Sequence, residues 1–167
     1  MNIRSKVSEV RKWTKKGKAF RAIGEYKKAI ACYNRAIKMS PGYLKALYNK
    51  GNVLLALGRY RQAFECYEKV IKRNPNYAPA LHNMGWVLDA VGRYDEALTY
   101  YDRALKIVPG DVDLWNNKGV DLYELKKYKE AIACFNRAIS IEPLYERARN
   151  NKRECKQRSI IRSMDID

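Results

Sequence analysis

The chain has no long hydrophobic run and only one histidine. No apolar segment approaches the ~18 residues that a membrane-spanning helix needs, and the opening stretch MNIRSKVSEVRKW has no apolar segment suited to a signal peptide. One histidine and four cysteines give no close-spaced cluster that would bind a metal ion. We therefore expect a cytoplasmic protein that does not act at a membrane and that carries neither a metal nor another cofactor.

The sequence also lacks the patterns of an enzyme. His82 has no cysteine or serine at a spacing typical of a nucleophile pair, and there is no glycine-rich loop of the kind that cradles phosphates. The carboxylates are scattered over polar positions, with no paired arrangement that suggests acid–base catalysis. The sequence therefore predicts a protein without catalytic residues.

What the chain does contain is one pattern that recurs every 34 residues. Its clearest copy runs from Leu44 to Tyr77. The matched positions are the glycines Gly17, Gly51, Gly85 and Gly119, the tyrosines Tyr26, Tyr60, Tyr94 and Tyr128, the alanines Ala29, Ala63, Ala97 and Ala131, the aromatic residues Tyr33, Tyr67, Tyr101 and Phe135, and the prolines Pro41, Pro75, Pro109 and Pro143. Self-similarity at a fixed period of this length is the signature of a stacked repeat array.

Each repeat has the pattern of two helices. Apolar residues in 44–57 follow the 3.6-residue period of an amphipathic helix, and those in 60–72 mark a second one. Gly58 tolerates the left-handed conformation that commonly ends helices, and Pro75 stops the second helix because it cannot continue one. A single helix pair cannot bury its apolar face alone, whereas stacked pairs can.

Some positions within the repeat carry more specific expectations. Gly51 costs about 1 kcal/mol inside a helix relative to alanine, so we expect it to allow a close helix–helix approach against the small Ala63. Lys126 replaces the inter-helix glycine of the fourth repeat, where a left-handed conformation would strain it by roughly 1–2 kcal/mol unless that turn is built differently. Three cysteines share one repeat position and are expected to pack as small apolar groups: Cys32, Cys66 and Cys134.

These repeats resemble the tetratricopeptide repeat. The first repeat carries the family pattern at Trp13, Gly17, Phe20, Ala29, Tyr33, Ala36 and Pro41. The fourth carries it at Trp115, Gly119, Leu122, Ala131, Phe135, Ala138 and Pro143. The resemblance implies an all-α fold, a right-handed superhelical solenoid of antiparallel helix pairs.

The resemblance also sets the expected domain organisation. We place a lead-in at 1–9, repeats at 10–43, 44–77, 78–111 and 112–145, and a capping helix with a tail at 146–167. The last helix is expected to begin near Tyr145 or Glu146 and to turn Ala148 and Cys155 inward, because a terminal repeat needs its exposed face covered.

In this family, one face of the first helix of each repeat lines a concave groove that binds ligand peptides. We call this the groove face, and it carries asparagines at 34-residue steps from the second repeat to the capping helix: Asn49, Asn83, Asn117 and Asn151. Asparagine is a mediocre helix former, but its amide offers both a donor and an acceptor. The pattern predicts an asparagine ladder that pairs with the backbone of an extended peptide, with inheritance by repeat duplication as the alternative. Further peptide-binding candidates are Asn52, Tyr48, His82, Trp86 and Asn116.

The net charge of +16 is spread unevenly. The first two repeats carry +9 and +5, the third carries −2 and the fourth is neutral. The expected anion-binding residues of the groove face are Arg11, Lys15, Lys18 and Lys45, and the expected acidic residues further on are Asp89, Asp113 and Asp121 or Glu124. We therefore expect a ligand with an acidic segment that meets the N-terminal end of the groove.

The leading interpretation is a non-catalytic protein-interaction scaffold that binds an extended, partly acidic peptide or partner tail. Nucleic-acid binding, to RNA for example, through the basic N-terminal half is one alternative, although Trp13 and Phe20 occupy packing positions and leave no free aromatic residue for base stacking. Homo-oligomer formation through 146–167 is another, with the acidic end at 164–167 docking into the basic first repeat of a second copy.

Overall fold

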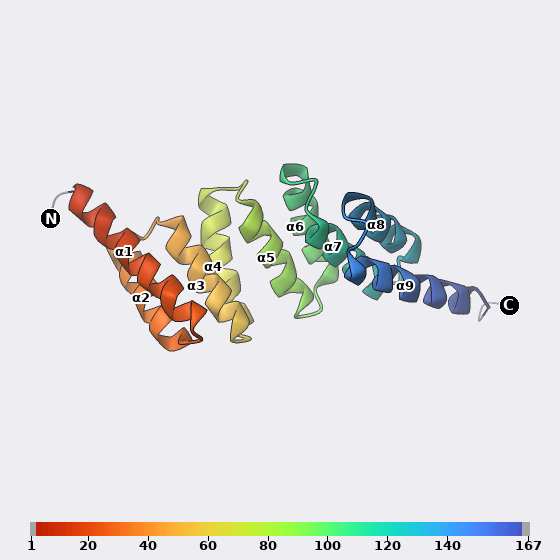
Figure 1. Ribbon diagram of the computed structural model, residues 1–167, viewed down its shortest axis with the longest axis horizontal. Helices are drawn as coiled ribbons and strands as arrows, with labels where there is room; N and C mark the ends of the chain where they lie inside the picture. Colours follow the sequence, from red (N-terminus) through yellow and green to blue (C-terminus); the bar gives the residue numbers. More distant parts are fainter. Residues whose placement is uncertain (1–2, 165–167) are drawn as a thin grey trace. The chain divides into compact units, whose positions relative to one another are not determined.

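The structure is a computed structural model that describes residues 3–164. Its helices are α1 (Ile3–Ala22), α2 (Tyr26–Met39), α3 (Leu44–Ala56), α4 (Tyr60–Arg73), α5 (Ala78–Asp89), α6 (Tyr94–Ile107), α7 (Val112–Glu124), α8 (Tyr128–Ile141) and α9 (Glu146–Met164) (Figure 1). No strand occurs among the described residues. The predicted fold class, an all-α solenoid of helix pairs, is confirmed.

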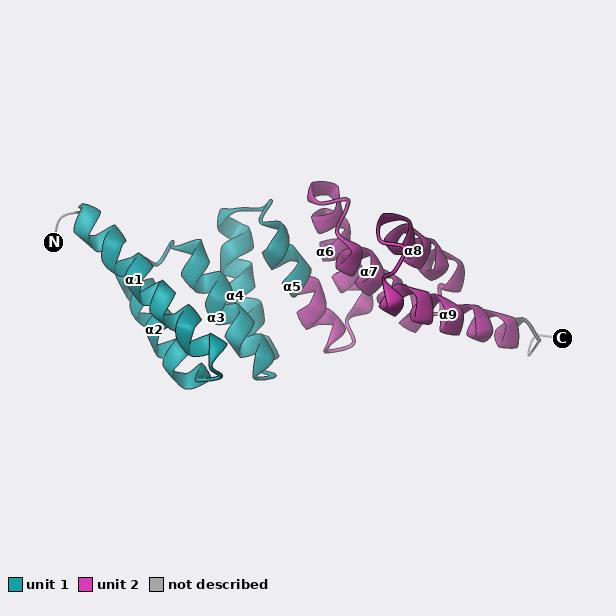
Figure 2. Cartoon of the chain, viewed as in Figure 1, with its two compact units in different colours: residues 1–83 teal, residues 84–167 magenta. Residues whose placement is uncertain are grey.

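The chain divides into two compact units, residues 1–83 and residues 84–167, and the boundary falls within α5 (Figure 2). In unit 1, α1 packs against α2, α2 against α3 and α3 against α4. In unit 2, α6 packs against α7, α7 against α8 and α8 against α9. Each unit is therefore a series of neighbouring helices, as expected for stacked repeats.

The helical glycines make room for an aromatic ring. A Cβ atom on Gly51 would lie 2.6 Å from Cε1 of Tyr67, whose side chain is fully buried. The same pairing recurs at Gly17 with Tyr33, Gly85 with Tyr101 and Gly119 with Phe135. The expectation that Gly51 packs against Ala63 is wrong, because the longer side chain of Tyr67, one turn further along α4, occupies that space.

The turn between the two helices of a repeat uses a left-handed residue. Gly24, Gly58 and Gly92 have φ angles of 76°, 67° and 75°, and Lys126 has a φ of 60° at the matching place in the fourth repeat. The same turn is therefore kept in every repeat, and the expected strain of roughly 1–2 kcal/mol falls on Lys126.

The buried apolar residues recur at the same positions of each repeat, and α9 packs over the apolar face of the fourth repeat. Cys32, Cys66 and Cys134 are buried free thiols, as predicted. Ala148 and Cys155 are fully buried in a cluster that includes Phe135 of α8, which confirms their inward orientation.

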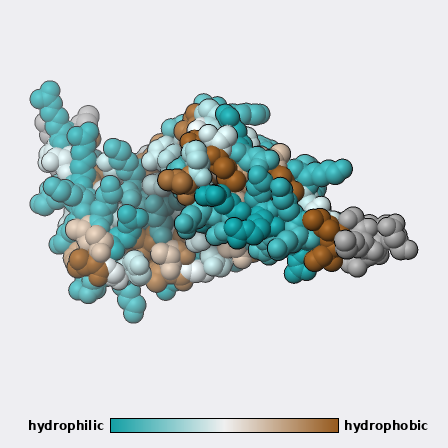
Figure 3. All heavy atoms as spheres, turned by 45° about the vertical axis from the view of Figure 1, so that its right-hand side comes forward, coloured by the Kyte–Doolittle hydropathy of each residue, from teal (hydrophilic) through white to brown (hydrophobic). Residues whose placement is uncertain are grey.

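Both ends of the chain add helix beyond the repeats. Residues 3–9 of the expected lead-in belong to α1. Near the other end, Ile160 and Ile161 of α9 are exposed. Figure 3 shows that hydrophobic patches occur between the hydrophilic areas of the visible surface. The acidic end proposed for docking, 164–167, lies outside the residues whose side chains the structure describes.

Candidate functional site

In unit 1, residues of the groove face form a hydrogen-bonded cluster of amides and phenols. Nδ2 of Asn83 donates to Oδ1 of Asn52 at 2.8 Å, and it lies 3.3 Å from the hydroxyl oxygen of Tyr67 and 3.4 Å from that of Tyr48. The Tyr67 hydroxyl donates to the same Asn52 oxygen at 2.8 Å. The donor side of Asn83 is therefore engaged, while no donor among the described residues reaches its Oδ1.

Tyr48 is held within an aromatic cluster. Its ring centroid lies 6.1 Å from that of Tyr67 and 5.4 Å from that of Tyr77, and the two pairs are inclined by 51° and 62°. Burial raises the pKa of Tyr67 and also that of Tyr77, so both phenols stay neutral at physiological pH. Tilted aromatic pairs of this kind fix the orientation of the rings and with them the hydroxyl groups that meet Asn83.

Asn49, the first predicted rung of the ladder, has a different role. It is only 7% exposed, and its Nδ2 donates back to the carbonyl oxygen of Lys45 one turn earlier in α3. The structure therefore does not bring Asn49 into the cluster around Asn83.

Unit 2 contains a second amide cluster. Oδ1 of Asn116 accepts from Nδ2 of Asn151 at 2.9 Å, and Nδ2 of Asn116 donates to Oδ1 of Asn117 at 3.4 Å. Asn116 is 1% exposed. Asn151 thus reaches a residue 35 positions earlier, as Asn83 does when it meets Tyr48. The asparagines link neighbouring repeats in both units.

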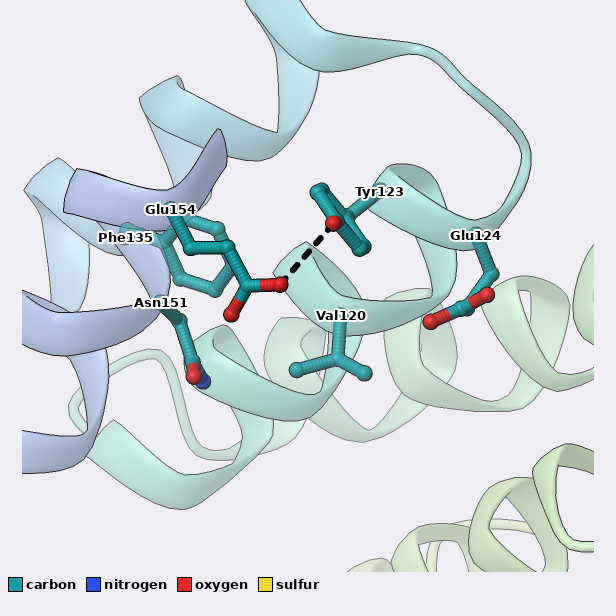
Figure 4. A pocket seen from close by; sticks show the side chains of 6 residues that line it. All are labelled: Val120, Tyr123, Glu124, Phe135, Asn151 and Glu154. Carbon is teal, nitrogen blue, oxygen red and sulfur yellow. Dashed lines mark hydrogen bonds between the residues drawn. The ribbon is translucent and has the colours of Figure 1, made fainter. Parts of the chain in front are cut away.

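A pocket of about 170 Å³ opens beside Asn151. Its lining residues are Val120, Tyr123, Glu124, Phe135, Asn151 and Glu154 (Figure 4). Within it, the Tyr123 hydroxyl donates to Oε1 of Glu154 at 3.0 Å. Glu124 and Glu154 contribute two carboxyl groups to the lining of this pocket.

Asp121 was expected as an acidic residue of the groove face, but its side chain is fully buried. No N–H or O–H donor among the described residues reaches either carboxylate oxygen. Burial, together with the nearby carboxyl groups of Asp89 and Glu124, raises the pKa of Asp121 to about 8. Asp89 is the carboxyl group that contributes most to this shift after burial, and the raised pKa keeps Asp121 protonated at neutral pH.

The predicted cationic residues lie on the surface of unit 1. Arg11, Lys15 and Lys18 are exposed on α1 and Lys45 is exposed on α3. Within the described part of the chain, none of the four forms an ion pair. Their charges are therefore not neutralised by the protein.

The aromatic residues beside this basic surface are partly buried and pack against the core, as predicted. Trp13 packs against the buried Val10 and Ala36, and the guanidinium of Arg35 lies 4.2 Å from its ring centroid. Phe20 packs against a cluster that contains Tyr33. Neither ring is available for base stacking.

The remaining peptide-binding candidates have side chains that are exposed or partly buried. Trp86 is 42% exposed, while His82 and Asn117 are partly buried. Over residues 3–164, no group of three or more His, Cys, Asp or Glu side chains is arranged to hold a metal ion. None of the helices that the structure describes has the length and apolar character to cross a membrane.

Comparison with solved structures finds the same fold in MamA. One MamA crystal structure has a TM-score of 0.85 and 20% sequence identity, over 95% of this chain and 86% of that one. A MamA structure from Desulfovibrio magneticus RS-1 has a TM-score of 0.86 and 19% identity, over 90% of this chain and 85% of that one. At this level of identity, the likeness establishes the fold alone. No curated protein matches the sequence.

Family models of one repeat type match most of the chain. Models described as tetratricopeptide repeat match residues 42–109 and 112–145, and a model described as TPR repeat matches residues 17–58. Such arrays are protein-interaction scaffolds, and the helix pairs described above have their arrangement. The chain belongs to the tetratricopeptide repeat family.

Proposed function

We propose that this protein is a non-catalytic scaffold that binds an extended, partly acidic peptide or partner tail along its groove face. The observation that carries the proposal is the amide and phenol cluster around Asn83. Its Nδ2 is held by Asn52, Tyr67 and Tyr48, which leaves the amide oxygen as an oriented acceptor.

An oriented acceptor suits a peptide backbone. Every non-proline residue of an extended ligand offers an N–H group, so the Asn83 oxygen would accept from ligands of many sequences. Each such hydrogen bond contributes a net of about 0.5–1.5 kcal/mol. Because the side chain is already fixed by its neighbours, little rotamer entropy is lost when the ligand binds. In this proposal Asn151, whose Nδ2 is likewise engaged by Asn116, acts in the same way in unit 2.

The charge of unit 1 supports an acidic ligand segment. Residues 1–83 hold 19 of the 34 Lys and Arg residues but only four of the 18 acidic ones. Arg11, Lys15, Lys18 and Lys45 form no ion pair within the described residues, so they would attract carboxylates and speed association. Because these side chains are exposed, the attraction should weaken as the ionic strength rises.

Nucleic-acid binding is the second candidate, since the same unneutralised cations would bind phosphates. It is less well supported because Trp13 and Phe20 are packed against the core, so that the basic surface lacks stacking rings.

The test is affinity capture from a lysate of the source cells, with and without nuclease, followed by mass spectrometry. Wild type is compared with Asn83→Ala and with Asn136→Ala, an exposed asparagine of α8 that serves as the matched control. We expect a nuclease-resistant protein partner that the control retains and Asn83→Ala loses, with folding of each variant checked by thermal unfolding. Capture that nuclease abolishes and Asn83→Ala leaves unchanged would reject the proposal in favour of nucleic acid.

A further inference from the structure

Unit 1 contains a pocket that no residue of the groove-face cluster lines. We call it the α2–α4 pocket, and it has a volume of about 230 Å³. Its lining residues are Ile30, Asn34, Lys50, Leu54, Arg59, Gln62, Glu65, Cys66 and Lys69. The pocket is therefore formed by α2, α3 and α4, with apolar side chains and a thiol accompanied by amides and charged groups.

The charges of this pocket do not balance. Lys50 comes from α3, Arg59 directly precedes α4 and Lys69 lies on α4. None of the three forms an ion pair with any described residue. The one acid of the pocket, Glu65, lies 3.8 Å from Arg61 and is paired with it. Asn34 and Gln62 add amide N–H donors, so donors and positive charge dominate the pocket.

The matching place in unit 2, 68 residues further along, keeps the cations but neutralises them. Its Lys118 forms an ion pair with Asp102, with Nζ 2.5 Å from Oδ1. Its Lys127 forms an ion pair with Asp95 at 3.4 Å. Lys118 of unit 2 is therefore paired with a carboxylate, whereas Lys50, at the same repeat position of unit 1, forms no ion pair with a described residue.

The sequence difference responsible is small. Asn34 stands at the repeat position of Asp102, and Lys27 stands at that of Asp95. Gln62 likewise stands at the position of Glu130. Three acids of unit 2 are thus replaced by two amides and a lysine around the α2–α4 pocket. Unit 1 has one acid in return, since Glu65 stands at the position of Ala133, so one carboxylate accompanies the three cations that line the pocket.

The charges that act on the buried thiols of Cys66 and Cys134 differ between the two units in the same way. Burial raises the pKa of Cys66, Lys50 and Lys69 lower it, and Glu65 raises it. At the matching Cys134, burial raises the pKa to about 11, Lys118 lowers it, and Asp102 with Glu130 raises it. The ammonium groups of Lys50 and Lys69 therefore both act on the Cys66 thiol, where one carboxylate opposes them. At Cys134 of unit 2, two carboxylates oppose the single ammonium group of Lys118.

We propose that the α2–α4 pocket is a binding site for a small multivalent oxyanion of the phosphate class. Lys50, Arg59 and Lys69 would neutralise its charge, since guanidinium and ammonium groups form the strong charge-assisted hydrogen bonds that phosphates accept. Asn34 and Gln62 would donate to the remaining oxygens. This site goes beyond the peptide groove, because it shares no residue with the cluster around Asn83 and can be tested separately.

The test titrates the full-length protein with inorganic phosphate at constant ionic strength and follows binding by calorimetry and by the amide resonances of the pocket. Asn34→Asp installs the carboxylate that Asp102 provides in unit 2, and we expect it to weaken phosphate binding at least tenfold. Asn136→Asp is the matched control, because it adds the same charge at the corresponding position of the fourth repeat and outside this pocket. We expect it to leave binding within about twofold.

The reciprocal variant of unit 2, with Asp95→Lys, Asp102→Asn and Glu130→Gln together, should free Lys118 and Lys127 and raise the stoichiometry of phosphate binding from one to two. Phosphate that binds wild type and Asn34→Asp equally, or that shifts no resonance near Lys50 and Cys66, would overturn the proposal.

A phosphoserine peptide compared with its unphosphorylated form identifies the source of the oxyanion. Phosphopeptide binding at least tenfold tighter than inorganic phosphate, and weakened by Asn34→Asp, supports a phosphorylated partner, whereas equal affinity supports a free phosphate.

Discussion

Replacing Asp121 by asparagine should remove a pH-dependent weakness of unit 2. Asp121 is fully buried at a repeat position where the second and third repeats have the buried residues Val53 and Val87. Its neighbours Asp89 and Glu124 add negative charge. Asparagine keeps the shape of the side chain, carries no charge and donates to the Asp89 carboxylate, so the substitution removes the repulsion without opening a cavity.

The sign and size follow from the raised pKa. Asp121 holds its proton in the folded chain up to about pH 8, whereas in the unfolded chain it releases it near its ordinary value of 3.8. Below pH 3.8 Asp121 is protonated in both the folded and the unfolded chain and adds no pH dependence, and between the two values stability falls as the pH rises. One proton corresponds to about 1.4 kcal/mol per pH unit. Wild type should therefore lose about 2–3 kcal/mol between pH 5 and pH 7 relative to Asp121→Asn.

The assay is urea unfolding at pH 5, 6, 7 and 8, with free energies compared between wild type and variant at each pH. Glu142→Gln, at an exposed position, is the control, and its free energy of unfolding should change with pH as that of wild type does. If Asp121→Asn also runs parallel to wild type across this range, the reasoning about the buried acid pair is refuted. Asp121→Val, which restores the residue type of Val53, should be at least as stable as wild type at pH 7.

Two further substitutions test the packing of the repeat. Lys126→Gly should stabilise the chain by about 1 kcal/mol in thermal or urea unfolding, because it relieves a left-handed lysine with a φ of 60°; a loss of stability would contradict the strain. Gly51→Ala should destabilise by about 1–2 kcal/mol, since the new Cβ would meet the buried Tyr67 ring and overpacking outweighs the gain in helix propensity. Gly110→Ala, with no atom within 4 Å of the new Cβ, is its control and should change stability by less than about 0.5 kcal/mol.

Much of the fold was predictable because repetition converts weak local signals into strong ones. A single glycine such as Gly58 is an ambiguous turn signal, but its recurrence every 34 residues fixes a turn in each repeat. For the same reason the left-handed conformation of Lys126 was predictable, although lysine itself disfavours it. The burial of Cys66 and Cys155 followed from the helical period in the same way.

The candidate site was predictable only in part. The sequence identified the groove-face asparagines, but the structure gives them separate roles: Asn49 bonds within its own helix, and Asn83 bonds to the preceding repeat. The partner of Gly51 was likewise mistaken, because the length of the Tyr67 side chain, and not only its helical face, decides which atoms meet. The burial of Asp121 was missed because a polar residue at an apolar repeat position was assumed to face the groove.

By itself, the sequence determined the repeat, its helices, their turns and the concentration of positive charge in the first half, since these depend on period and composition. Only the tertiary structure decided which side chains of neighbouring helices meet. The 35-residue offset between Asn83 and Tyr48, the burial of Asp121 near the carboxyl group of Asp89, and the missing carboxylate beside Lys50 all depend on contacts between helices. A helical period fixes the direction in which a side chain points, but the register and separation of packed helices fix what it reaches.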